Sequence, residues 1–130
     1  MRHRARKLAV QAIYQWQLAA TPWSELEKSF FTAVNIKKID LEYLRFLLFN
    51  VINHVNDIDA MIIPILDRSL DDLNPVELAI LRLAVCELLY QKDVPYKVVI
   101  NEALELEKVF GSTDGFKYVN AILDKIRTKV

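Results

Sequence analysis

The sequence contains little glycine, proline or cysteine: two Gly, four Pro and one Cys in 130 residues. Tight turns depend on glycine and proline, so their scarcity argues against a turn-rich β-sandwich or barrel and favours helices. With one cysteine the chain cannot form an intramolecular disulfide. Cys86 lies in an apolar run and is expected to be a small core residue rather than a reactive thiol.

Signals for metal binding, secretion and membrane insertion are also missing. Two histidines and one cysteine give no recognisable metal-ligand spacing. The basic N-terminus is followed by Gln11, Gln15 and Gln17, so it lacks the continuous apolar segment of a signal peptide. No run approaches the ~18–20 apolar residues that a membrane span needs. We therefore expect a cytoplasmic protein with no metal, no cofactor and no membrane association.

The length and the hydrophobic content indicate one folded domain. A chain of 130 residues fits a single domain, here 1–130, and can bury a core without disulfides or metals. The hydrophobic fraction of 53% excludes a disordered chain. No internal repeat or low-complexity tract divides the sequence.

Apolar residues at a spacing of about 3.6 predict a first helix from about His3 to Leu18. Its buried stripe is expected to be Ala5, Leu8, Ala9, Ala12, Trp16 and Ala19. A second helix has two possible starts. Pro22 is tolerated at the first helical position, and Ser24 with Glu27 forms a competing capping box one turn later.

Polar caps predict the next two helices. Asp40 can cap a helix from Leu41 to about His54. Asn56 or Asp57 then caps a short helix that ends near residues 64–65.

The clearest helix start comes next. Asn74, Pro75 and Glu77 combine an N-cap, a proline at the first helical position and an acid at the third. The helix that they open, to about Tyr90, is apolar nearly all round, because its few polar residues do not share a face. Such a helix is normally central and surrounded by others.

Two more helices complete the pattern. Pro95 interrupts the chain, because the residue before a proline avoids the helical region. Residues 97–110 then form a helix that Gly111 is expected to end in a left-handed conformation. Thr113 or Asp114 caps the last helix. The buried positions of this last helix are expected to be Val119, Ile122, Leu123 and Ile126.

Together these elements predict an all-α fold of about seven helices with no convincing strand. A parallel strand over residues 94–100 is the alternative. It is disfavoured because no second run of this kind is available to pair with it.

No catalytic constellation is visible. The sequence has no glycine-rich phosphate loop and no nucleophile elbow. Paired acids, such as Asp71 with Asp72 and Glu105 with Glu107, are expected to be solvated surface. Acid–base catalysis needs a pocket that shifts a pKa, and no pattern here indicates one. We therefore expect a protein that is not an enzyme.

Charge is distributed unevenly although the net charge is zero. The first acid is Glu25, and the basic side chains that precede it are Arg2, Arg4, Arg6 and Lys7. These cations crowd the N-terminal end of the first helix, where the helix dipole disfavours a cation by ~0.3–1 kcal/mol. An anionic ligand that offsets the repulsion would explain the arrangement.

The polar face of the first helix carries His3, Lys7, Gln11 and Tyr14, opposite the apolar stripe. Lysine and arginine contacts to phosphate give salt-dependent affinity. An exposed aromatic ring can stack on an unpaired base for ~1–3 kcal/mol. Single-stranded RNA recognition uses this combination. The simpler alternatives are a basic N-terminus that only improves solubility and a Tyr14 ring that packs on a neighbouring helix.

Eight segments carry recognisable motifs: residues 4–16, 66–70, 76–82, 87–88, 93–103, 110–111, 114–120 and 123–125. The most specific is Asp-Val-Pro-Tyr-Lys-Val-Val-Ile-Asn-Glu-Ala, at 93–103. In order and spacing, and over nearly the whole chain, these segments resemble the NusB family of bacterial transcription antitermination factors.

The resemblance implies an all-α fold of two small packed helical bundles without catalytic activity. Family members bind the boxA RNA of ribosomal RNA transcripts together with NusE, a protein of the small ribosomal subunit. With other Nus factors they join a complex in which RNA polymerase resists termination. By this resemblance the chain is a single-domain adaptor for single-stranded boxA RNA and NusE.

The resemblance also assigns site residues. RNA would bind Arg2, His3, Arg4, Arg6, Lys7, Gln11 and Tyr14 of the first helix and, beside it, Phe110, Asp114, Lys117 and Tyr118. NusE would face Asp71, Glu77 and Arg82. The chain departs from the family pattern at Phe116, Tyr118 and Ala121, where histidine, phenylalanine and glycine are expected.

Two other functions are consistent with the pattern. NusB-like domains also resemble the N-terminal part of some ribosomal RNA cytosine methyltransferases. Because the chain ends at Val130, we do not expect a methyl-donor-binding domain. A purely protein-binding helical scaffold is the other alternative, and there the first helix would be solvated surface.

Overall fold

The computed structural model describes residues 2–33 and 40–130, and the side chains of 2–28 and 40–130. The α-helices are α1 (Arg2–Ala19), α2 (Trp23–Ala33), α3 (Leu41–Asn53), α4 (Val55–Ile62), α5 (Pro75–Tyr90), α6 (Tyr96–Phe110) and α7 (Thr113–Ile126). Short 3-10 helices are η2 (Ile63–Ile65), η3 (Leu70–Asp72) and η4 (Arg127–Lys129). The described ranges contain no strand, so the all-α prediction is confirmed and the strand alternative at 94–100 is wrong.

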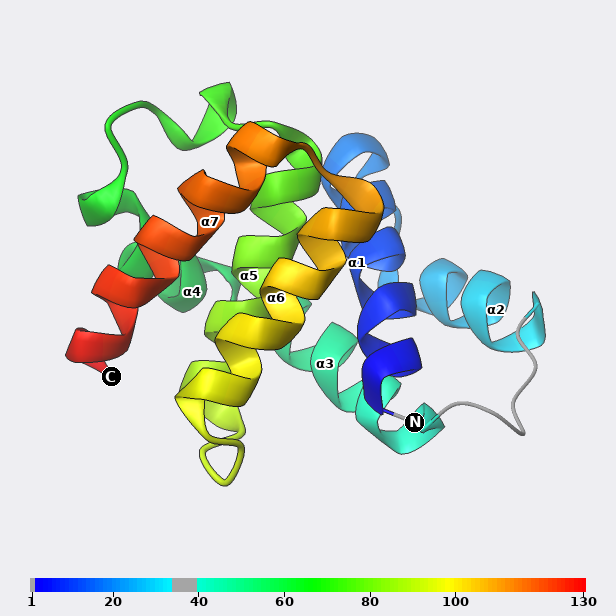
Figure 1. Cartoon of the computed structure of the whole chain (residues 1–130). Coiled ribbons are helices and arrows are strands. Elements are labelled where there is room, and N and C mark those ends of the chain that lie inside the picture. The colour runs from blue at the N-terminus through cyan, green and yellow to red at the C-terminus, as the bar shows by residue number, and fades with distance from the viewer. Residues whose placement is uncertain (1, 34–39) are drawn as a thin grey trace.

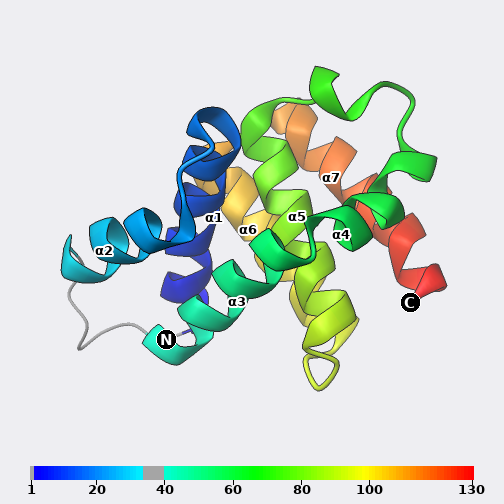
Figure 2. The same cartoon turned by 180° about the vertical axis from the view of Figure 1, so that it is seen from behind.

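The helix α5 is the centre of the fold, as predicted. It contacts α1, α3, α4, α6 and α7 (Figures 1 and 2). The helices α1, α2 and α3 pack together, and α7 packs against both α6 and α4. Buried side chains therefore occur all round α5. Cys86 is one of them, and burial raises the pKa of its thiol to about 12, as expected for an unreactive core cysteine.

The N-caps of α3 and α5 are confirmed. The Asp40 carboxylate accepts a hydrogen bond from the Tyr43 backbone N–H at 3.0 Å. The Asn74 side-chain oxygen accepts one from the Val76 N–H at 2.8 Å, and Pro75 occupies the first helical position. Each cap satisfies a backbone donor that the first turn of a helix leaves free.

The starts of α2 and α4 differ from the predicted ones. The Pro22 carbonyl accepts from the Leu26 N–H at 3.1 Å, so Pro22 precedes α2 instead of opening it. The helix α4 begins directly after His54, which provides no side-chain cap. The predicted caps Asn56 and Asp57 therefore lie inside α4. Packing of apolar residues starts this helix before its polar side chains could cap it.

The turn between α6 and α7 also differs from its prediction. Gly111 has φ −107° and ψ −154°, an extended conformation rather than a left-handed one. Ser112, not Thr113 or Asp114, caps α7, because its hydroxyl accepts from the Gly115 N–H at 3.0 Å. The predicted burial of the apolar face of α7 is confirmed for all four positions.

The apolar content of α3 and α4 belongs to the core. In the described part of the chain, no single helix is long and apolar enough to cross a membrane. The segments 41–53 and 55–65 meet such a test only as a pair, which is bent by 76°. Many of their apolar side chains, among them Leu44, Leu47 and Ile58, are fully buried, whereas Phe49 and Ile63 are exposed.

The buried side of α1 is broader than predicted, because α1 packs against both α3 and α5. Ala5, Ala9 and Ala12 are fully buried as expected. The structure adds to the buried set Arg6, Val10 and Ile13. Ala19, which was expected in the stripe, is exposed.

A buried polar cluster joins α1, α3 and α5. The Arg6 side chain is 5% exposed, and its Nε and Nη2 donate to the Glu87 carboxylate at 2.9 and 2.8 Å. The Tyr43 hydroxyl donates to the same carboxylate. Burial, with this hydrogen bond, raises the pKa of Tyr43. A bidentate arginine–carboxylate pair with a further donor satisfies charges that would otherwise be costly to bury. This burial argues against the predicted contact between Arg6 and RNA.

Replacing Arg6 by Met should destabilise the protein by about 3–5 kcal/mol, because the substitution leaves the Glu87 charge buried with only a tyrosine donor. The exposed Arg4→Met variant is the matched control and should change stability by less than about 0.5 kcal/mol. Urea unfolding measures both. Equal effects of the two substitutions would show that the buried pair is not a structural requirement.

Candidate nucleic-acid and partner interface

Acids on neighbouring elements partly neutralise the basic end of α1. The Arg2 guanidinium lies 4.2 Å from the centre of the Tyr43 ring, and its Nε lies 4.0 Å from an Asp40 oxygen. The His3 Nδ1 lies 2.9 Å from a Glu102 oxygen. The protein itself therefore offsets part of the charge for which the sequence suggested an external anion.

The remaining polar residues of α1 are available to a ligand. Arg4 and Gln11 are exposed, while Lys7 and Tyr14 are half-buried. Within the described residues, Arg4 and Lys7 form no ion pair or hydrogen bond. Tyr14 packs against the core, so the packing alternative for this ring holds in part. The candidate nucleic-acid surface of α1 is thus Arg4, Lys7, Gln11 and the accessible part of Tyr14.

The second predicted patch lies around the turn from α6 to α7. Asp114 and Lys117 are exposed, while Phe110 and Tyr118 are half-buried. The Arg68 guanidinium lies 4.9 Å from the centre of the Tyr118 ring. Arg68 is therefore a further candidate, which the sequence analysis did not include. Its position in the motif segment 66–70 was the available signal.

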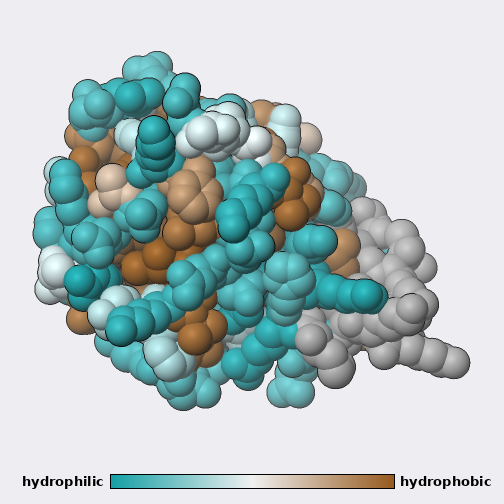
Figure 3. All heavy atoms as spheres, viewed as in Figure 1, coloured by the Kyte–Doolittle hydropathy of each residue, from teal (hydrophilic) through white to brown (hydrophobic). Residues whose placement is uncertain are grey.

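The two patches flank α6. The helix α6 lies between α7 and α1 in Figure 1, and Figure 2 shows it partly behind α5, next to α1. Glu102 of α6 joins this helix to α1 through His3 and through Arg6, whose Nη1 lies 3.7 Å from a Glu102 oxygen. Hydrophilic side chains cover most of the face in Figure 3, with apolar patches between them. A ligand that contacts both patches must therefore cross α6.

The predicted partner-facing residues have different surroundings. Asp71 is exposed in η3, and Glu77 is half-buried in the first turn of α5. The Arg82 side chain is 11% exposed, and its Nε and Nη2 donate to the Asp59 carboxylate at 3.0 and 2.9 Å. Its Nη1 donates to the Gln17 side-chain oxygen at 3.1 Å. Arg82 is thus committed to internal contacts, and we no longer include it in the partner surface.

Glu107 is a functional candidate that sequence reasoning missed. Its neighbour Glu105 is exposed, as expected, and pairs with Lys108 at 3.1 Å. Glu107 is only 1% exposed, so the prediction that it is solvated is wrong. Neither of its carboxylate oxygens has a hydrogen-bond partner.

Two glycines make room for this carboxyl group. A Cβ atom at Gly111 would collide with the Glu107 carboxylate. At Gly115, a Cβ atom would lie 2.6 Å from the Glu107 Oε1 and 2.7 Å from the Glu77 Cδ. The carboxyl groups of Glu77 and Glu107 thus flank one glycine. Burial, and then the charge of Glu77, raise the pKa of Glu107 to about 7.

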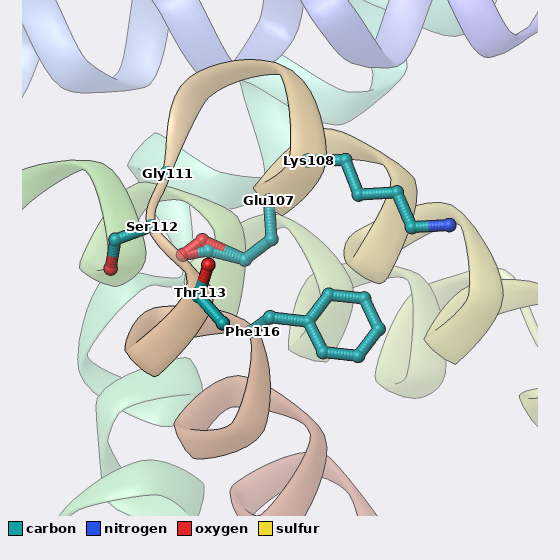
Figure 4. A pocket seen from close by; sticks show the side chains of 6 residues that line it. All are labelled: Glu107, Lys108, Gly111, Ser112, Thr113 and Phe116. Carbon is teal, nitrogen blue, oxygen red and sulfur yellow. The ribbon is translucent and has the colours of Figure 1, made fainter.

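Cavities lie on both sides of this carboxyl pair. One, of about 320 Å³, is lined by Glu107, Lys108, Gly111, Ser112, Thr113 and Phe116 (Figure 4). The Lys108 Nζ lies 5.9 Å from the centre of the Phe116 ring. The other, of about 460 Å³, is lined among others by Asp72, Glu77 and Asp114. No group of three or more His, Cys, Asp or Glu side chains that could hold a metal occurs in the described ranges.

These features define a small all-helical protein whose polar face combines cations, aromatic rings and acids. The NusB family model matches residues 3–128, and the chain belongs to the NusB family. It is 52% identical to the transcription antitermination protein NusB of Shewanella piezotolerans, over 98% of this chain and 96% of that protein.

Solved structures agree with this assignment. A crystal structure of the antitermination factors NusB and NusE in complex with dsRNA matches with a TM-score of 0.86 and 31% identity, over 100% of this chain and 99% of that one. NusB of T. maritima matches with a TM-score of 0.86 and 30% identity, over 99% and 92% of the two chains. The predicted family and fold class are confirmed.

Stability should fall as the pH rises from about 4.5 to about 7, through the contribution of Glu107. The folded-state pKa of about 7 exceeds the ordinary value of 4.5, so the folded state binds more protons than the unfolded state in this range. The stabilisation is fully present below pH 4.5 and is lost as the pH passes 7. Its maximum is about 3 kcal/mol.

The Glu107→Gln variant isolates this contribution. Relative to the wild type, the Glu107→Gln variant should become more stable as the pH rises from 5 to 8, measured as the free energy of unfolding. Glu105→Gln, which removes an exposed carboxylate from the same helix, should show no such trend. Urea unfolding at four pH values tests this, and parallel profiles for all three proteins would contradict the assignment.

Proposed function

We propose that this protein is a transcription antitermination factor that binds the boxA RNA of ribosomal RNA transcripts together with NusE. In a complex with other Nus factors it helps RNA polymerase to resist termination. The observation that carries the proposal is the relationship of nearly the whole chain to NusB proteins, at 52% identity. The structural match to a NusB that is bound to NusE and RNA supports both partners. This relationship also favours the adaptor over the methyltransferase-accessory and scaffold alternatives.

The protein acts as a cytoplasmic, non-catalytic adaptor in this proposal. Its raised-pKa carboxyl group, Glu107, is enclosed and not presented to a substrate. The polar groups that are accessible are those of a binding surface. Arginine and lysine side chains supply attraction to phosphates, and aromatic rings supply stacking.

RNA contacts both patches beside α6 in this proposal. On α1 it contacts Arg4, Lys7, Gln11 and Tyr14, with Arg2 and His3 at the edge. At the α6–α7 turn it contacts Phe110, Asp114, Lys117 and Tyr118. A half-buried ring that keeps one accessible side suits an unpaired base, so we propose single-stranded RNA as the ligand. The related complex contains dsRNA, and the experiment below therefore includes both forms.

NusE contacts the acids near the start of α5. Asp71 is exposed in η3, and Glu77 lines the larger cavity together with Asp72 and Asp114. Such a group of carboxylates attracts basic side chains of a partner and orients the encounter.

RNA titrations across salt concentrations test the proposal. Affinity for single-stranded boxA RNA should fall with salt and should rise when NusE is present. Arg4→Gln or Lys7→Gln should each reduce the slope of log affinity against log salt by about 0.7. Lys125→Gln, at the far end of α7, is the control and should leave the slope unchanged. Weak binding that is the same for any RNA, single- or double-stranded, with and without NusE would sink the proposal.

Substitutions at Tyr118 test base stacking. Tyr118→Ala should lose ~1–3 kcal/mol of RNA-binding free energy, which is about five- to 150-fold in affinity. Tyr118→Phe keeps the ring and should bind within about twofold of the wild type. Thermal unfolding of both variants checks the fold. Equal losses for Phe and Ala would assign the effect to the hydroxyl group, which lies 3.4 Å from Asp67, instead of to stacking.

A further inference from the structure

Glu107 is a buried acid that none of the proposed contacts uses. The other buried acid of α5 and α6, Glu87, receives three hydrogen bonds, two from Arg6 and one from Tyr43. Glu107 receives none, although the exposed fraction of both residues is 2% or less. Burying an unpaired carboxylate costs free energy, so the Glu107 side chain is either protonated or stabilised by a nearby cation when it ionises.

The position of Glu107 connects it to the partner surface. Glu77 and Glu107 both lie against the space above Gly115, so their carboxyl groups are neighbours. Glu77 lines the larger cavity and is half-buried, so it is accessible to a partner. Glu107 lies behind it, on the side of the smaller cavity. A charge on Glu107 therefore acts on whatever binds at Glu77, even without contact.

The other charged groups around the pair come from each neighbouring element. Glu77 of α5 acts directly on Glu107, and Arg68 of the loop before α5 acts on Glu77. The cavity on the Glu77 side is lined by Asp72 of η3, by Asp114 and Tyr118 of α7, and by Arg68 itself. On the Glu107 side the nearest charged cavity residue is Lys108, and its amine is paired with Glu105. None of these cations forms an ion pair with Glu107 in the described structure.

We propose that Glu107 is a positioning residue for partner binding. By holding or releasing its proton, Glu107 sets the charge of the Glu77 site, where a basic side chain of NusE binds. When Glu107 is protonated, the site presents one carboxylate at its centre. A bound ammonium or guanidinium group favours the ionised form of Glu107. Its O–H bond then breaks, and the proton passes to the solvent buffer. Docking of the partner is thus linked to proton release, and affinity rises with pH. This inference rests on the proposed function.

Calorimetric titration of NusE into the protein tests the linkage. Heats measured in two buffers with different ionisation enthalpies give the number of protons released per complex. Near pH 7 the wild type should release about 0.4 proton more than the Glu107→Gln variant. From pH 6 to pH 8 its affinity should gain about fivefold relative to that variant. Protonation changes of groups on NusE itself contribute equally to the wild-type and Glu107→Gln experiments, so they cancel in the comparison.

Glu105→Gln is the matched control, because it removes an exposed carboxylate two residues away and should keep the wild-type linkage. Equal proton release and parallel affinity profiles for the wild type and Glu107→Gln would overturn the inference while leaving NusE binding intact. Failure of the wild type to bind NusE at any pH would instead reject the proposed function, and the inference with it. A merely structural role of Glu107 would change affinity equally at every pH and would also contradict the inference.

Discussion

The ion pair between Arg6 and Glu87 is buried where α1, α3 and α5 meet, and Tyr43 completes it from α3. Removing either charge would leave the other uncompensated in the core, so the pair fixes how α1 lies on α5. That placement decides which side of α1 faces outward. It turns Arg4 and Gln11 to the solvent and holds the Tyr14 ring partly against the core. The polar surface of α1 is thus a consequence of a buried contact.

This contact changes how the basic N-terminus is understood. Glu87 and Glu102 neutralise Arg6, and Asp40 lies near Arg2, so fewer cations are free for phosphate than the sequence suggests. Two buried acids of the fold then have opposite surroundings. Glu87 has its cation inside the protein, whereas Glu107 has none and lies beside a carboxylate of the partner surface. The first stabilises the fold, and the second is the natural place for binding to be linked to a proton.

The parts of the fold that depend on local chemistry were predictable from the sequence. Periodicity and the caps Asp40 and Asn74 predicted α3 and α5, and the nearly all-apolar pattern predicted that α5 is central. The roles of Arg6 and Glu107 were not predictable in this way. Arg6 meets Glu87 across 81 residues in the sequence. Glu107 is enclosed beside Gly111, which was predicted only to end a helix, and beside Gly115, for which no role was predicted. Pairings between distant residues decide whether a charged side chain is buried, and periodicity alone does not encode them. The family resemblance supplied the predicted contacts at the α6–α7 turn and the partner. It did not indicate that Arg6 and Arg82 form internal ion pairs with Glu87 and Asp59.

The helix α1 divides its cations between the core and the proposed RNA surface. The most direct measurement follows the arginine Nε–Hε resonances by NMR while boxA RNA and NusE are added. The Arg6 resonance should exchange slowly with water and stay in place, because its hydrogen bond to Glu87 persists, while the Arg4 resonance should shift. Rapid exchange of the Arg6 resonance together with a shift on RNA addition, with Arg4 unchanged, would contradict the account.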